Sequence, residues 1–262
     1  MRNPLRTMNR RKSLRIMNSK RFMEARARAL LESGKTEGIG RLSEKTLHKT
    51  IKYYLEPNEA CHEVKLLGSI ADIANSYGIF EIQTRAAYKL IPKIRKFLGG
   101  EYPVTLVLPL AAKKAISWVD RESGEISPPR KSPKSASIFD ALYEISAMSE
   151  FIKNPKFRVK LIFIDATEFR YFGKYGKKRR TERIELIANF IISEYEISGK
   201  WDIESRILIP EEEFTAKEFQ RLTKRDRRRT YYILKLLESL EIIESAGKIK
   251  NAVIYRKNER HI

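Results

Sequence analysis

The sequence predicts an α/β (α+β) fold, with a mixed sheet flanked by helices and a small C-terminal domain of helices and one hairpin. Three observations predict it. Residues 43–110 read in order as helix, three strands, helix and strand. Residues 137–172 add a helix and a long apolar strand. After residue 180 the pattern changes to amphipathic segments of helical period that end in a basic hairpin. A chain of 262 residues is long enough to build both domains with ample core.

Charge is the most informative feature of the composition. The chain carries 53 Lys and Arg against 33 Asp and Glu, a formal net charge of +20. Such an excess favours a polyanionic partner, because basic side chains displace the counterions condensed on nucleic acid. DNA, RNA in a ribosome-associated setting and an anionic membrane surface are the candidates, and we expect nucleic acid. The chain contains no run of about eighteen apolar residues, so we expect no membrane-spanning helix.

Cysteine usage and the N-terminus bear on the compartment. Cys61 is the single cysteine, so no disulfide can form within the chain, which suits a reducing cytosol. The N-terminus is basic but lacks the apolar middle of a secretory signal. We therefore expect a cytoplasmic protein.

Residues 1–29 form a basic N-terminal segment in which ten Lys and Arg accompany one acidic residue, Glu24. Segments of this kind are often tails that become ordered on nucleic acid. The sequence also allows a helix that begins at about Ser19 and turns Phe22 and Leu30 inward. Both interpretations stay open at this point.

The first predicted domain covers residues 30–175. Leu47 and Ile51 recur at helical spacing, and Pro92 either kinks a later helix or begins its second half. The expected elements are a helix at 43–56, strands at 60–68, 70–76 and 78–84, a helix at 85–100, a strand at 102–110, a strand and polar loop at 114–135, a helix at 137–152 and a strand at 157–172.

Two acidic side chains interrupt the apolar hairpin at residues 68–85. Asp72 lies in its first strand and Glu81 in its second, and Gln83 shares a face with Glu81 because side chains alternate along a strand. Pairing of the strands brings the carboxylates close, where they repel each other unless something offsets the charge. A divalent cation such as Mg²⁺ does so, since it takes carboxylate and carbonyl oxygens. In the structural alternative, Asp72 pairs with Arg85 and Glu81 faces solvent on an edge strand.

The pattern of Asp72, eight intervening residues and then Glu81-Ile82-Gln83, with Glu44 in a preceding helix, resembles the PD-(D/E)xK nuclease superfamily. The surrounding order of helices and strands also resembles its restriction-endonuclease-like core, most closely in the Holliday-junction-resolvase-like branch. The resemblance implies a Mg²⁺- or Mn²⁺-dependent deoxyribonuclease. Asp72, Glu81 and the carbonyl of Ile82 would bind the metal, and Glu44 would support the site. It further implies a duplex or branched DNA substrate and a possible homodimer, because duplex cleavage in this superfamily often needs two active sites.

Gln83 departs from the family pattern, which usually has lysine at this position to orient the nucleophilic water. Some restriction endonucleases of the superfamily carry glutamine there, which can hold a water by hydrogen bonds but supplies no charge. The sequence therefore predicts either an active nuclease in which Gln83 positions water, or a non-catalytic DNA-binding regulator on a nuclease-like scaffold. His48, one helical turn after Glu44, is a further candidate for the site, as are His62 and Lys65.

The second predicted domain covers residues 180–262 and follows a basic, glycine-containing break at 173–180. Its three expected helices and terminal hairpin resemble a winged helix in outline. The expected helices lie at 181–197, 215–223 and 225–243, and the hairpin lies at 244–258.

This second resemblance implies a DNA-binding surface. In helix-turn-helix domains the second helix of the motif enters the major groove with its N-terminal residues leading. A protein-interaction module is the alternative, which the arginine cluster disfavours. The residues expected to contact DNA are Lys224, Arg227, Arg228, Arg229, Lys248 and Lys250.

Overall fold

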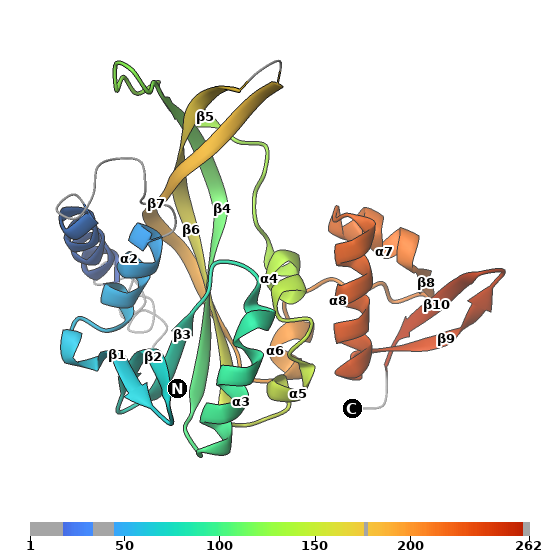
Figure 1. Ribbon diagram of the computed structural model, residues 1–262. Helices are drawn as coiled ribbons and strands as arrows, with labels where there is room; N and C mark the ends of the chain where they lie inside the picture. The colour runs from blue at the N-terminus through green and yellow to red at the C-terminus, as the bar shows by residue number, and fades with distance from the viewer. Residues whose placement is uncertain (1–17, 34–44, 176–177, 259–262) are drawn as a thin grey trace, which may run out of the picture.

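The computed structural model describes residues 18–33, 45–175 and 178–258, and it confirms the predicted mixed α/β class (Figure 1). A seven-stranded sheet has helices on both faces, and a three-stranded sheet lies near the C-terminus. None of the helices in the described ranges has the length and apolar character needed to cross a bilayer.

The large sheet has the strand order β1-β2-β3-β4-β6-β7, with β5 paired to β4. The β3–β4 and β4–β6 pairs are parallel and the others are antiparallel, so the sheet is mixed. Its strands are β1 (His62–Leu66), β2 (Ser69–Asn75), β3 (Gly78–Ile82), β4 (Val104–Val119), β5 (Arg130–Lys131), β6 (Phe157–Tyr175) and β7 (Lys178–Ile197).

A tight turn joins β2 to β3 and sets their register. Gly78 follows the turn with φ +118°, and a Cβ there would lie 2.5 Å from the carbonyl oxygen of Pro103, so only glycine fits. The register pairs Ile73 with Phe80. Asp72 and Glu81 are the next residues along the two strands, one step further from the turn. They therefore lie opposite each other, as the predicted hairpin requires.

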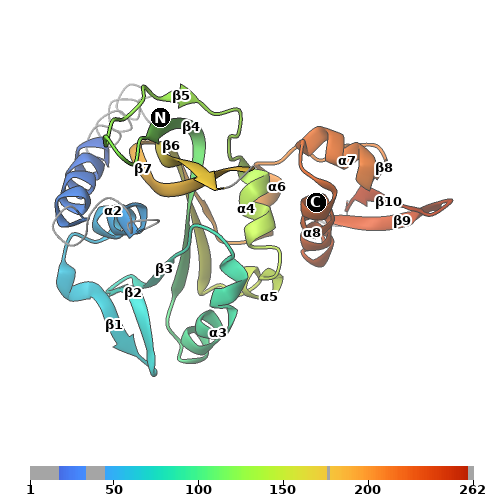
Figure 2. The ribbon, with the colours of Figure 1, turned by 45° about the horizontal axis from the view of Figure 1, so that its top comes forward.

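Helices cover both faces of the large sheet (Figure 2). On one face, Phe22 and Ile51 pack with Ile162 of β6. On the other, Phe97 packs with Leu106 of β4. The first face carries a helix over residues 18–33, α2 (Lys45–Leu55) and the short 3₁₀ turn η1 (Glu59–Cys61). The second face carries the 3₁₀ turn η2 (Ala87–Leu90), α3 (Ile91–Gly99), α4 (Ile138–Glu144) and α5 (Ser149–Ile152).

The helix over residues 18–33 favours the second interpretation of the basic N-terminal segment. Phe22 is only 1% exposed, and Nε of Arg26 donates to the carbonyl of Ala188 at 2.9 Å. Arg21 donates in the same way to the carbonyl of Leu55. These arginines therefore bind the protein itself, while residues 1–17 lie outside the described part of the chain.

Two predicted helices have different bounds in the structure. Pro92 lies in the first turn of α3, where its missing N–H costs nothing, so the α-helical part of the predicted 85–100 helix begins there, after the η2 turn. The predicted helix at 137–152 is divided into α4 and α5. Ser137 begins α4 through a capping box with Asp140.

The predicted helix at 181–197 is wrong, because these residues belong to β7. They pair with β6 along its whole length, and Ile184, Leu186 and Ala188 are buried at a spacing of two. The β-branched isoleucines of this segment favour an extended chain. The break predicted at 173–180 is therefore the end of the β6–β7 hairpin, and the large sheet continues to Ile197, beyond the predicted domain boundary.

The remaining elements form what we call the C-terminal unit, residues 200–258. Thr215 caps α7 through a capping box with Glu218, as expected for an N-cap. Phe219 and Leu237 of this unit belong to the same buried cluster as Leu142 of α4, so both units share one core. Its elements are α6 (Lys200–Glu204), β8 (Phe214–Thr215), α7 (Ala216–Thr223), α8 (Arg227–Ser239), β9 (Ile243–Ile249) and β10 (Ala252–Lys257), with strand order β8-β10-β9.

Candidate functional site

A cavity of about 770 Å³ lies between α2, the β2–β3 hairpin and α3. Asp72, Glu81, Ile82 and Gln83 all line it, so we call it the carboxylate cavity. The cavity thus gathers the three predicted metal-site residues Asp72, Glu81 and Ile82 together with Gln83. Glu44 lies outside the described residues.

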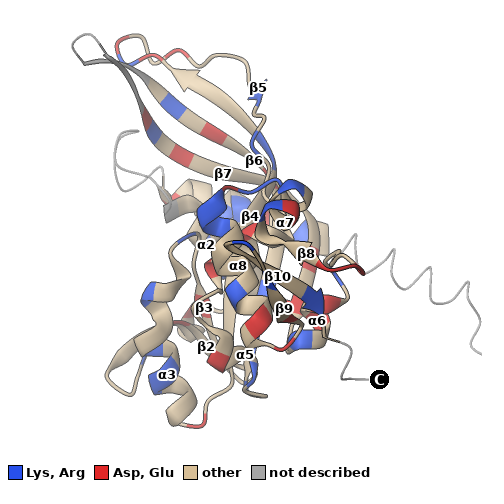
Figure 3. Cartoon of the chain, turned by 90° about the vertical axis from the view of Figure 1, so that its right-hand side faces the viewer, with Lys and Arg blue, Asp and Glu red and all other residues tan. Residues whose placement is uncertain are grey.

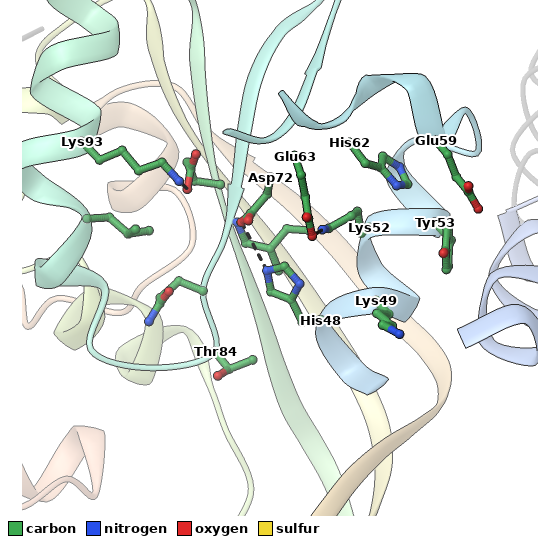
Figure 4. A pocket seen from close by; sticks show the side chains of 14 residues that line it. His48, Lys49, Lys52, Tyr53, Glu59, His62, Glu63, Asp72, Thr84 and Lys93 are labelled. Atoms are coloured by element: carbon green, nitrogen blue, oxygen red, sulfur yellow. Dashed lines mark hydrogen bonds and ion pairs between the residues drawn. The ribbon is translucent and has the colours of Figure 1, made fainter. Parts of the chain in front are cut away.

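Asp72 occupies the side of the cavity nearest α2. Its Oδ2 lies 3.2 Å from Nε2 of His48 and accepts the backbone N–H of Ile82 at 2.8 Å (Figure 4). Burial alone would raise the pKa of Asp72, but the His48 hydrogen bond and charge, the Ile82 N–H and the Lys93 ammonium together hold it below its usual value. Asp72 is therefore ionised at neutral pH. His48, a further candidate from the sequence, thus contacts Asp72 directly.

Glu81 lies deeper and is only 1% exposed. It cannot face solvent on an edge strand, because β3 runs between β2 and β4. Oε2 accepts a hydrogen bond from Nζ of Lys93 at 2.6 Å, whereas Oε1 is buried without a hydrogen-bond partner in the described part of the chain. Burial raises the pKa of Glu81 to about 7, the Asp72 charge adds to the rise, and Lys93 opposes it.

Lys93 is the residue that the sequence reasoning missed. It comes from the first turn of α3, the helix that crosses from β3 to the parallel strand β4. Such a crossover helix begins where β3 ends, so its first turn can return a side chain to Glu81. The available signal was a lysine directly after Pro92, the residue at which the predicted 85–100 helix could begin its second half. Figure 4 shows Lys93 reaching into the cavity from the side opposite His48.

Gln83 lines the cavity one residue beyond the end of β3. Its amide nitrogen donates to the carbonyl of Arg85, so its amide is oriented by its own loop. The side-chain oxygen is an acceptor and carries no charge. The positive charge beside Glu81 therefore comes from Lys93 rather than from position 83.

The two further candidates, His62 and Lys65, differ in position. His62 lines the cavity, and its Nε2 lies 2.8 Å from the carbonyl oxygen of Glu56. Burial, followed by the charges of Lys52 and Arg28, lowers the pKa of His62. Lys65 is exposed on β1 and does not line the cavity.

The oxygen atoms of the cavity fit a hard divalent cation. Asp72 and Glu81 supply carboxylates, and Oε1 of Glu81 is a buried acceptor without a hydrogen-bond partner in the described part of the chain, although Lys93 already pairs with the other oxygen. Mg²⁺ and Mn²⁺ accept such oxygens together with carbonyl and water ligands. Among the residues that the structure describes, no three or more His, Cys, Asp or Glu side chains are grouped to hold one ion. The rest of a coordination shell would have to come from the Ile82 carbonyl, water or a phosphate.

The basic residues predicted to contact DNA fall into two groups. Figure 3 shows Lys and Arg on α7, α8 and the terminal hairpin. Arg229 is held against α4, because its Nη1 lies 2.9 Å from Oδ1 of Asp140 and its guanidinium lies over the ring of Tyr143. The exposed members are Lys224, Arg227, Arg228, Lys248 and Lys250.

A family profile described as a domain of unknown function, DUF8091, matches residues 45–197. The chain belongs to the DUF8091 family. The matched range runs from the start of α2 to the end of β7, so it contains the whole carboxylate cavity. The C-terminal unit lies outside the DUF8091 match.

A relative of the chain is an uncharacterized protein of Treponema pallidum (strain Nichols), 29% identical over 142 residues. The alignment covers 54% of this chain and 56% of the relative, so the chain matches little more than half the length of that protein. No solved structure matches the chain.

Proposed function

We propose that the chain is a metal-dependent DNA endonuclease whose active site is the carboxylate cavity. The observation that carries the proposal is the pair of carboxylates on adjacent strands, with opposite pKa shifts and one buried oxygen lacking a partner in the described part of the chain. Perturbed carboxylates that converge in a cavity are typical of catalytic sites. The element order from α2 to β4, with a parallel β3–β4 pair, agrees with the resemblance to the PD-(D/E)xK superfamily.

Asp72 and Glu81 would hold Mg²⁺ or Mn²⁺ with the carbonyl of Ile82. When bound, the cation would stabilise the charge that develops on the phosphate. His48 holds Asp72 ionised and fixes its orientation through the 3.2 Å contact. Lys93 supplies the charge that Gln83 lacks, and Gln83 offers its side-chain oxygen to a water. Glu44 remains a proposed supporting residue.

The C-terminal unit would hold the DNA. Its order of strand, two helices and hairpin is that of a winged helix, which supports this role. The exposed Arg227 and Arg228 at the start of α8, and Lys248 and Lys250 near the hairpin turn, would contact phosphates or bases. A homodimer would place two cavities on one duplex.

The test compares the wild-type protein with Asp72→Asn on supercoiled, linear and branched DNA in Mg²⁺ or Mn²⁺. The wild type should cut, and Asp72→Asn should cut about 100-fold more slowly or worse, because a metal ligand is removed. Asp120→Asn is the matched control, since Asp120 is exposed in a turn far along the chain from the cavity residues. Equal cleavage by wild type and Asp72→Asn, or no cleavage with any metal, would overturn the enzyme proposal.

The second candidate is a non-catalytic DNA-binding regulator on the same scaffold. The Lys93–Glu81 ion pair favours it, because an internal cation already neutralises Glu81. Calorimetry with Mn²⁺ discriminates the two candidates. An enzyme should give a binding heat that Asp72→Asn and Glu81→Gln abolish, whereas a regulator should bind DNA tightly and give no such heat. An RNA-binding protein would instead prefer structured RNA to DNA in competition.

A further inference from the structure

A second cavity, of about 760 Å³, lies between the large sheet, α4 and the C-terminal unit. It is lined by Lys114 of β4 and Arg183 of β7 on the sheet side, and by Arg225 from the turn before α8 on the other. Thr84 lines both this cavity and the carboxylate cavity, so the two hollows adjoin. We call the second one the basic cavity.

The basic cavity carries an excess of positive charge. Seven Lys and Arg side chains line it, against four Asp and Glu. Lys114 is already paired with Glu168 at 2.8 Å. Lys134, in the loop before α4, and Lys224, at the C-cap of α7, present exposed side chains at its rim. An excess of this kind attracts an anion into a partly enclosed space, where attraction is stronger than at an open surface.

One carboxylate serves two guanidinium groups inside the cavity. Asp140 accepts from Nη2 of Arg225 at 2.6 Å and from Nη1 of Arg229 at 2.9 Å, and Arg229 has a second acidic neighbour in Asp226. Nε of Arg225 is nevertheless buried without a hydrogen-bond partner in the described part of the chain. A buried donor left unsatisfied costs about 1–3 kcal/mol. The guanidinium of Arg225, which lines the cavity, therefore has hydrogen-bonding capacity that the described protein groups do not satisfy.

We propose that the basic cavity binds backbone phosphates of the DNA strand that leads into the carboxylate cavity. This inference rests on the proposed nuclease function for the direction of the strand, because Thr84 marks the point where one cavity meets the other. Arg225 contacts a phosphate from within, and Lys134 and Lys224 contact the strand at the rim. The C-terminal unit and the large sheet thus hold one strand between them.

The experiment measures binding of fluorescently labelled duplex and branched DNA by anisotropy in EDTA, so that no cleavage occurs. The test variant is Lys134→Gln/Lys224→Gln, which changes two exposed side chains of the cavity. The matched control, Lys65→Gln/Lys153→Gln, removes the same charge from exposed positions that line no cavity described above.

The cavity variant should raise the dissociation constant about tenfold, and its salt slope should fall by about 0.9 for each phosphate that the protein no longer neutralises. The control should keep the wild-type slope. Equal slopes for the cavity variant and the wild type, or equal weakening in both double variants, would overturn the proposal. Inorganic phosphate at the nucleotide concentration of the DNA should not displace it, and displacement would assign the cavity to a free anion instead. Stronger binding of RNA of the same length would overturn the DNA assignment.

Failure of this inference can be told apart from failure of the nuclease proposal. If the cavity variant weakens binding but no metal supports cleavage, the cavity binds DNA and the enzyme proposal falls. If the wild type cuts DNA while the cavity variant binds and cuts normally, the basic cavity is not part of the DNA path.

Discussion

At the scale of single residues, the carboxylate cavity combines side chains from one hairpin with Lys93, a side chain from a separate helix. Asp72, Glu81 and Gln83 were found from spacing, because side chains alternate along a strand and a tight turn sets the register. Lys93 was not, because its approach to Glu81 depends on where α3 crosses the sheet. Spacing in sequence predicts contacts within a hairpin, whereas contacts between elements require the packed fold.

In the proposed nuclease, Lys93→Met separates metal binding from chemistry. Removing the ammonium frees Oε2 of Glu81, so Mn²⁺ should bind as tightly as in the wild type or more tightly by calorimetry. Cleavage should fall about 100-fold, because the charge that Gln83 lacks is removed with it. Lys96→Met, on the same helix and outside the cavity lining, is the control and should cut normally. Unchanged cleavage by Lys93→Met would show that Lys93 serves only the fold.

Glu185 gives a pH prediction independent of the site. Burial raises the pKa of this carboxyl above its ordinary value of 4.5, although a hydrogen bond with Thr46 opposes the rise. The folded chain therefore holds the proton more tightly than the unfolded chain, and the resulting stability is complete below the ordinary value and lost as the pH rises through the raised one.

Glu185→Gln should accordingly raise the free energy of unfolding at pH 8 and lose that advantage towards pH 4. Each tenfold difference in proton affinity is worth about 1.4 kcal/mol. Urea unfolding at several pH values measures it. Glu182→Gln, an exposed position on the same strand, should show no comparable pH trend. A Glu185→Gln advantage that is the same at both pH values would contradict this account.

At the scale of elements, prediction succeeded where periodicity was distinct and failed where it was not. The hairpin β2–β3, the capped helix α7 and the terminal hairpin were predicted closely, since each has a turn or cap signal. The segment of β7 was predicted as a helix, because its apolar residues fit either period over a short window. Pairing with β6 decides the conformation of this segment, and its own sequence does not show that β6 is its partner.

The contact between α4 and α8 is an element-scale feature with a direct test. Asp140→Ala removes the acceptor shared by Arg225 and Arg229. Hydrogen exchange of the α8 amides should then be faster, with the free energy of local opening lower by about 1–3 kcal/mol. Glu150→Ala removes an exposed ion pair of α5 and should leave α8 exchange unchanged. Unchanged exchange in both variants would mean that apolar packing alone holds the helices together.

At the scale of the whole molecule, the chain forms two separate sheets, but one apolar core joins the C-terminal unit to the rest. Phe219 of the C-terminal unit lies edge-on to Phe139 of α4, with ring centroids 6.0 Å apart, and both belong to or pack on one apolar cluster. The predicted boundary near residue 180 assumed two independent cores, and a shared one cannot be read from a change in sequence pattern.

A shared core predicts that the molecule unfolds in one transition. Calorimetric and van't Hoff enthalpies should agree. Phe219→Ala should lower the single midpoint, at a cost of about 3–5 kcal/mol, without dividing the transition into two. Ile249→Ala, at an exposed position of the terminal hairpin, should change stability by less than about 0.5 kcal/mol. Two separate transitions in the wild type would show that the units fold independently.

The Thr84 junction between the two cavities has a consequence for the products of the proposed reaction. Because α8 packs against α4, the distance between the two cavities is fixed by the fold. A DNA strand would therefore be bound and cut at two points that are a constant distance apart. The proposed nuclease would then cut a constant number of nucleotides away from the segment that it binds.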